Sequence, residues 1–266
     1  MKPPTPLQTL KVEEPEPGLW LVTLNRPEVL NALNTATSQD LLRVFGPLAY
    51  TPGDLRCIVL TGAGDKAFSA GGDLKERQGM TDDAWRLQHA IIEEAVYAIL
   101  NCSVPTIAAV NGIAFGGGCE VALCCDFIYA STGARFGQPE VTRGIMPGAG
   151  GTQNLPRAVG ERRAKELILS GRPFNAQQAH EWGLVNEVCD PDQLMPRAME
   201  VARQIAGNAP IAVRQAKKAI HQGLQTDLTS GLLIEVQAYE RMVATEDRHE
   251  GVRAFNEKRK PQFKGR

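Results

Sequence analysis

The chain has 266 residues, of which 43% are hydrophobic and 22% are charged, and its 29 basic residues nearly balance its 30 acidic ones. This composition is typical of a folded globular protein and argues against a disordered, fibrous or collagen-like chain. A net charge of −1 provides no long-range field that would attract nucleic acid or an anionic membrane, so an anionic ligand has to be bound by a local cluster of groups.

The lack of a recognisable targeting pattern and the usage of cysteine predict a cytoplasmic protein. The first residues, MKPPTPLQTL, have neither the apolar core of a signal peptide nor the Arg-rich pattern of a transit peptide. No apolar run approaches the roughly 20 residues that a membrane-spanning helix needs. The cysteines are few and lack a C-x-x-C spacing, so we predict that they are reduced core residues. They are Cys57, Cys102, Cys119, Cys124, Cys125 and Cys189.

The hydrophobic pattern of the first 130 residues alternates between strands and helices, which indicates an α/β fold. Short apolar runs rich in β-branched residues predict strands at Trp20–Leu24, Cys57–Leu60, Thr106–Val110 and Phe127–Ala130. Longer mixed segments predict helices at Ser38–Leu48 and Asp83–Leu100, the second capped by Asp82. Steps of three and four residues in the second helix predict one buried face, made of Ala84, Leu87, Ile91, Ala95, Ala98 and Ile99.

From Glu161 onward the pattern is almost entirely helical, with one strand predicted at Val185–Val188. The predicted helices are Ala164–Leu169, Ala176–Trp182, Pro191–Ile205, Ile211–Gln222, Leu228–Met242 and Asp247–Lys258. Because Leu232–Val243 carries apolar residues on more than one face, we expect it to pack against another subunit.

The segment Pro105–Asp126 is the most informative for chemistry. A predicted strand runs into the three glycines Gly116–Gly118 and then into an apolar helix, whose first N–H groups have no partner within the helix and favour negative charge. Glu120 follows among apolar residues, where desolvation would raise its pKa and suit it to proton transfer. Close packing of strand and helix is the alternative explanation for the glycines, and a favourable helix dipole is the alternative for Glu120.

Two other segments provide groups that would complete an acid/base site. In AFSAGGDL, Ala70 precedes two glycines, so we expect its N–H to be presented at a sharp turn opposite that of Gly117. Two such donors would polarise a carbonyl group and stabilise the enolate oxygen that develops when a nucleophile adds to the conjugated β-carbon. In FGQPEVTRGIMPGAGG, Glu140 follows Pro139 at the predicted start of a short helix. Taken alone, Glu140 is also explained as an ordinary acidic residue at a helix N-terminus.

These segments together resemble the enoyl-CoA hydratase/isomerase (crotonase) superfamily, and the similarity covers nearly the whole chain. The matching motifs are LNRPEVLNAL, FSAGGDLKE, AAVNGIAFGGGCEVAL, FGQPEV, PGAGGTQNLPRAVG and the terminal EGVRAFNEKRKPQFKGR. The resemblance implies a spiral of ββα units in residues 1–196, followed by a helical trimerisation region in residues 197–266. It also implies a homotrimer, or a homohexamer built as a dimer of trimers.

The same resemblance implies an enzyme that adds water reversibly and syn to a 2-enoyl-CoA, giving a 3-hydroxyacyl-CoA. Its oxyanion donors would be the N–H groups of Ala70 and Gly117. Glu120 and Glu140 would be the catalytic pair, with Glu140 as the protonated partner that donates to C2. Coenzyme A is part of the substrate, and neither a metal nor another cofactor is required. Gly72 stands where hydratases often have Ala.

Contacts to coenzyme A are likewise implied by the resemblance. The positions that match the substrate path are Arg26, Ala32, Ala70, Asp73, Leu74 and Gly148. Lys75 is placed to meet a phosphate as a point charge, or it is an ordinary surface lysine. Phe255 and Lys258 match a C-terminal helix that approaches the nucleotide of a neighbouring subunit.

Other functions stay open from the sequence. A 3,2-enoyl-CoA isomerase would use the same oxyanion hole with one glutamate. An inactive interaction subunit would need neither the oxyanion hole nor a catalytic glutamate. Some relatives of the methylglutaconyl-CoA hydratase branch bind RNA through a basic helix, and Ile211–Gln222 has basic residues at helical spacing, although a solvated face is the favoured explanation. These residues are Arg214, Lys217, Lys218 and His221. Acyl length and branching are undecided, because LKERQGM resembles the methylglutaconyl branch and FGQPE resembles short-chain hydratases.

Overall fold

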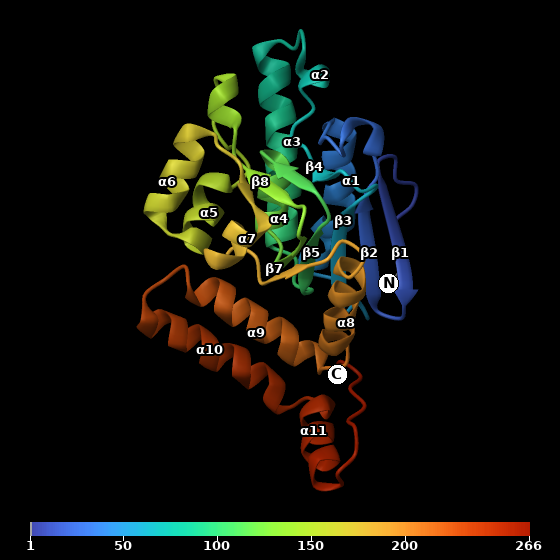
Figure 1. The fold of residues 1–266 in the computed structure, drawn as a ribbon. Coiled ribbons are helices and arrows are strands. Elements are labelled where there is room, and N and C mark those ends of the chain that lie inside the picture. Colours follow the sequence, from blue (N-terminus) through green and yellow to red (C-terminus); the bar gives the residue numbers. More distant parts are fainter. Residues whose placement is uncertain (1) are drawn as a thin grey trace.

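The computed structural model describes residues 2–266, and its largest sheet has six strands in the order β1-β2-β3-β5-β7-β10 (Figure 1). β1 pairs antiparallel with β2, and the other neighbours are parallel. The central strands β3 and β5 are buried along their whole length, as continuous apolar runs in a covered parallel sheet require. The strands are β1 (Leu10–Glu16), β2 (Leu19–Leu24), β3 (Cys57–Gly62), β5 (Thr106–Val110), β7 (Phe127–Ser131) and β10 (Glu187–Cys189).

A second sheet of four short strands lies beside the first, in the order β4-β6-β8-β9. β3, β5 and β7 are each followed by one of these short strands and then by helical segments, so the chain repeats a ββα unit, and the predicted α/β fold is confirmed. Strands of two or three residues are too short to show periodicity, which explains why they were not predicted. They are β4 (Ala67–Ser69), β6 (Ile113–Phe115), β8 (Arg135–Gly137) and β9 (Phe174–Asn175).

Helices surround the sheets and complete each unit. They are η1 (Pro27–Val29), α1 (Thr35–Phe45), η2 (Gly46–Ala49), α2 (Leu74–Arg77), α3 (Asp82–Leu100), α4 (Gly117–Leu123), η3 (Glu140–Arg143), α5 (Gly151–Val159), α6 (Glu161–Ser170) and α7 (Ala176–Glu181). All six cysteines are buried and unpaired, as expected for core residues.

The structure corrects two details of α3. Thr81, not Asp82, caps the helix, because its side chain accepts a hydrogen bond from Ala84 N. The predicted face is also wrong at its start, where Ala84 and Leu87 are exposed. Those first turns lie beyond the strands together with α2 (Figure 1), so only the later turns reach the core. The buried residues are Gln88, Ile92, Ala95, Val96 and Ile99.

The outer face of the large sheet is covered by α8 (Leu194–Ala206), whose Leu194, Ala198 and Ala202 pack on residues of β3, β5 and β7. The predicted boundary between residues 196 and 197 therefore falls inside a helix that belongs to the core of this sheet. We place the start of the separate helical region after α8.

Three helices follow and extend away from the sheets: α9 (Pro210–Gly223), α10 (Leu228–Val243) and α11 (Glu246–Asn256) (Figure 1). Lys217 of α9 joins them to the core, since its Nζ donates to Asp126 Oδ2 at 2.7 Å and to the carbonyl oxygen of Val104 at 2.9 Å. Within residues 2–266, no helix combines the length and the apolar character needed to cross a membrane.

Candidate active site

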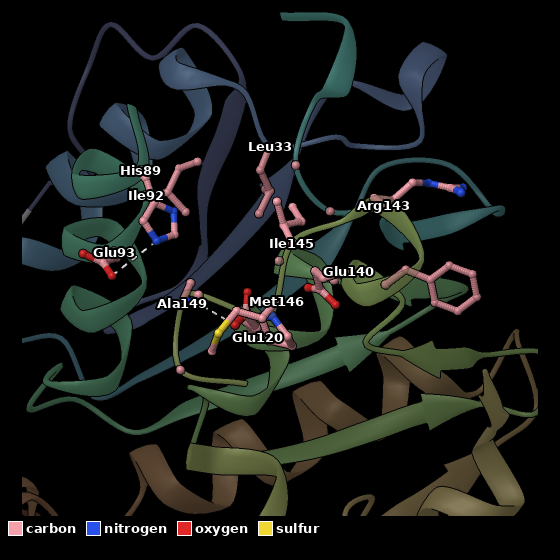
Figure 2. A pocket seen from close by; sticks show the side chains of 18 of the residues that line it. Leu33, His89, Ile92, Glu93, Glu120, Glu140, Arg143, Ile145, Met146 and Ala149 are labelled. Atoms are coloured by element: carbon pink, nitrogen blue, oxygen red, sulfur yellow. Dashed lines mark hydrogen bonds and ion pairs between the residues drawn. The ribbon is translucent and has the colours of Figure 1, made fainter. Parts of the chain in front are cut away.

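A cavity of about 710 Å³ opens between α3, the N-terminus of α4 and the segment that follows β8 (Figure 2). Its walls include the backbone of residues 70–72 and 115–117, the turn of residues 145–150 and side chains of α3. Glu120 and Glu140 both line it. The three segments that the sequence marked as chemically informative thus meet at one cavity.

Glu120 lies on the first turn of α4 and is 3% exposed. Its Oε1 accepts hydrogen bonds from Ala149 N and Gly151 N, both at 2.8 Å, so the glycine-rich turn fixes this carboxyl group. Burial raises the pKa of Glu120, while the two N–H donors and the neighbouring His89 ring oppose part of that rise. Its side chain is therefore rigidly held, with a proton affinity above that of an ordinary glutamate.

Glu140 is the first residue of η3, directly after Pro139, and faces the same cavity (Figure 2). Burial raises the pKa of Glu140 to about 7; a hydrogen bond from its own backbone N–H opposes this rise, and the Glu120 carboxylate adds to it. The buried Gln138 amide faces Glu140, and the orientation that gives this carboxylate a donor places the NH2 group 3.0 Å from Oε1 and 3.2 Å from Oε2. This carboxyl group is therefore suited to exchange a proton near neutral pH.

The predicted oxyanion donor Ala70 is wrong, because its N–H already donates to the carbonyl oxygen of Leu30 at 2.9 Å. Gly72 takes its place. In a parallel bridge to Leu33, the flanking Gly71 O and Asp73 N make the hydrogen bonds, so the N–H of Gly72 points away from Leu33. That N–H makes no hydrogen bond within residues 2–266, and Gly72 lines the cavity.

Gly117 supplies the second donor, since it is the first residue of α4 and its N–H has no partner in the helix. The two donor segments approach closely: a Cβ atom on Gly71 would lie 3.2 Å from Gly117 N and 2.6 Å from the carbonyl oxygen of Phe115. Gly71 also has a φ of +91°, which glycine adopts without strain. Two free backbone donors and two carboxyl groups therefore border one cavity.

Comparison with known proteins agrees with this arrangement. Residues 14–266 match the enoyl-CoA hydratase/isomerase family. The chain belongs to this family. It is 44% identical to the short-chain-enoyl-CoA hydratase of Clostridium acetobutylicum, covering 95% of this chain and 97% of the relative, and 42% identical to the crotonyl-CoA hydratase of Syntrophomonas wolfei, covering 94% and 96%. The crystal structure of an enoyl-CoA hydratase from Bacillus anthracis matches with a TM-score of 0.95 at 46% identity, covering 97% of this chain and 100% of that one.

The residues predicted to contact coenzyme A divide into three groups in this family member. Ala70, Leu74 and Gly148 line the cavity. Arg26 instead stabilises the turn beside it, since Nη1 donates to Ala32 O at 2.7 Å and to Asp73 Oδ2 at 3.0 Å. Asp73 in turn caps α2 by accepting from the backbone N–H groups of residues 75 and 76. Arg26, Ala32 and Asp73 thus position the turn that carries the Gly72 donor.

Three other predicted contacts lie off the cavity. Lys75 is exposed on α2 and does not line it. Phe255 lies in the last turn of α11 and Lys258 just after this helix, at the opposite end of the molecule from α2 (Figure 1), and Phe255 is 83% exposed. Contact with a nucleotide in a neighbouring subunit stays a prediction for this pair.

Among the cavity residues that were not predicted are Arg77, Trp85 and His89. The guanidinium group of Arg77 stacks on the Trp85 ring at 4.3 Å from its centroid. His89 projects into the cavity from α3 (Figure 2). If the buried face of α3 had been predicted correctly, His89 would have been placed beside the buried Gln88 and Ile92. The sequence could not have shown which segment of the chain lies opposite His89.

Proposed function

We propose that this protein is an enoyl-CoA hydratase, which adds water reversibly and syn across the C2–C3 double bond of a 2-enoyl-CoA thioester to give a 3-hydroxyacyl-CoA. The observation that carries this proposal is the pair of carboxyl groups, Glu120 and Glu140, facing one cavity beside the free N–H groups of Gly72 and Gly117. The relatives named as hydratases support the same reaction.

The mechanism follows from these four groups. The thioester oxygen binds between the N–H groups of Gly72 and Gly117, which stabilise the enolate as charge develops there. Glu120 acts as the general base: it removes a proton from water as the water oxygen bonds to C3. Glu140, whose pKa of about 7 keeps it substantially protonated near neutrality, donates a proton to C2. Both protons are handled by side chains, so the proposed reaction requires no cofactor beyond the coenzyme A of its substrate.

Replacement of each glutamate tests this proposal. Glu120→Gln and Glu140→Gln preserve shape but remove proton transfer, so kcat for crotonyl-CoA hydration should fall by about 10² to 10⁴ for each variant. The loss of the conjugated thioester absorbance measures hydration directly. Glu94→Gln, an exposed change on α3, is the matched control and should retain wild-type activity.

The isomerase alternative predicts a different result. A 3,2-enoyl-CoA isomerase would create the conjugated absorbance from a 3-enoyl-CoA and would tolerate the loss of one glutamate. Wild-type protein that isomerises a 3-enoyl-CoA but does not hydrate crotonyl-CoA would refute the proposed function.

We also infer that the protein works as a cytoplasmic homotrimer or homohexamer. Six unpaired cysteines support a reducing compartment. An exposed apolar stripe on α10 supports assembly, because residues at steps of four, four, three and four place large side chains on one face. The stripe consists of Leu228, Leu232, Val236, Tyr239 and Val243.

A further inference from the structure

We propose that His89 limits the length of the acyl group, making the site selective for short 2-enoyl-CoA thioesters. This inference rests on the proposed hydratase function and names its substrate class. It depends on the position of the imidazole ring, which lies between α3 and the turn that holds Glu120 (Figure 2).

The ring of His89 packs against Gly148 on the opposite wall of the cavity. A Cβ atom on Gly148 would lie only 2.5 Å from His89 Cε1 and 2.8 Å from Nε2, so no side chain fits between the ring and the turn. Gly148 directly precedes Ala149, whose N–H holds Glu120. The imidazole therefore bridges the two walls of the cavity immediately beside the proposed reaction centre.

The cavity walls give the direction in which an acyl chain would extend. The thioester oxygen is assigned to Gly72 and Gly117, and Glu120 lies one helical turn beyond Gly117. Gly151, whose N–H donates to Glu120, is the first residue of α5, and the next residues, Thr152 and Gln153, also line the cavity. A chain that passes the two glutamates and follows the turn of residues 148–151 would therefore meet the His89 ring, which packs against Gly148.

Two side chains with polar groups lie beside and beyond the bridge on α3. His89 Nε2 lies 3.4 Å from Glu93 Oε1, one turn further along α3, and Tyr97 follows after another turn. A long alkyl chain would have to displace the ring from Gly148 and remove these groups from water without offering hydrogen bonds, which is unfavourable. A four-carbon chain extends only one carbon beyond C3, so we expect it to avoid both costs.

Chain-length profiles test the proposal. We expect kcat/KM of the wild type to fall by about tenfold or more from trans-2-butenoyl- to trans-2-octenoyl-CoA. A single extra methylene group in a pocket changes kcat/KM by about 10- to 200-fold. His89→Ala opens the bridge and should raise the ratio of octenoyl to butenoyl activity by about tenfold. Glu94→Ala, exposed on the same helix, should leave that ratio unchanged.

Binding provides a second readout that is independent of catalysis. Inhibition constants of the saturated analogues butanoyl-CoA and octanoyl-CoA should show the same change in chain-length preference, with His89→Ala strengthening octanoyl-CoA binding relative to butanoyl-CoA. A ratio within twofold of the wild type in both measurements would overturn the length limit, as would an equal loss of activity at every chain length, which would make His89 a general support for Glu120. Absence of turnover by the wild type with every enoyl-CoA would instead refute the proposed function.

Discussion

Glu120 and Glu140 illustrate how two identical side chains acquire different chemical roles. Glu120 has one oxygen fixed by two backbone donors, whereas Glu140 follows a proline on a separate segment and is held by its own backbone N–H and by Gln138. Because they face one cavity and interact, their protons titrate as a shared pair. The active form of the pair carries one proton: Glu120 must be ionised to accept a proton, and Glu140 must be protonated to donate one.

The pH dependence of hydration follows from that state. The pKa of Glu140 is raised to about 7, so the acid is present below this pH and is lost above it. We therefore expect kcat/KM for crotonyl-CoA to fall as pH rises through about 7, approaching tenfold per pH unit. For dehydration of 3-hydroxybutyryl-CoA, kcat/KM should fall over the same pH range, because the reverse reaction also uses the singly protonated pair. Activity that stays constant up to pH 9 would contradict the assignment of Glu140 as the acid.

The donor assignment shows what residue patterns could and could not predict. Gly117 and Glu120 were predicted from their motif, because a glycine run before a helix has a direct backbone consequence, whereas Glu140 was predicted from the family resemblance; all three line the cavity. The choice between Ala70 and Gly72 could not be made in that way. It depends on a single parallel bridge to Leu33, a contact between segments far apart in the chain that decides which N–H is consumed.

Most helices and the buried central strands were predicted more reliably than the elements that shape the cavity, although the edge strand β1 was missed. The four central strands and the six C-terminal helices were found because apolar periodicity reports burial over many residues. The short strands of the second sheet were not predicted, and the buried face of α3 was predicted wrongly in its first turns. Their conformation depends on packing between units and on the cavity, and neither is encoded by local alternation.

At the level of elements, the ion pair between Lys217 and Asp126 holds the C-terminal helices to the core. The side chains are only 14% and 28% exposed, so removing the lysine leaves a partly buried carboxylate without its cation. We expect Lys217→Met to lower the free energy of unfolding by about 1–3 kcal/mol, measured by urea denaturation at fixed protein concentration.

The neighbouring Lys218 provides the control for this change. It is exposed on the same helix, so Lys218→Met should change the free energy of unfolding by no more than about 0.5 kcal/mol. Equal effects of the two substitutions would show that the ion pair does not contribute to stability. The pairing also explains why Lys217 is not part of a free basic surface for RNA, whatever the role of Lys218.

At the scale of the whole molecule, the motifs predicted the fold because they fix the strand-to-helix turns of each repeated unit. The division at residue 196 was less accurate, since α8 follows the last unit in the chain but covers the large sheet in space. The helices after α8 extend away from the sheets with apolar side chains in solvent, a surface that an isolated chain would not be expected to retain.

Charge placed on the α10 stripe should therefore change the mass of the assembly. We expect wild-type protein to elute at three or six times the 28.9 kDa of one chain in size-exclusion chromatography with light scattering. Leu232→Glu combined with Val236→Glu should reduce the assembly to smaller species, because two carboxylates would be buried without partners. Gln237→Glu adds charge to the same helix away from the stripe and should preserve the wild-type mass. A monomeric wild type, or a double variant that assembles normally, would show that this face is not the subunit interface.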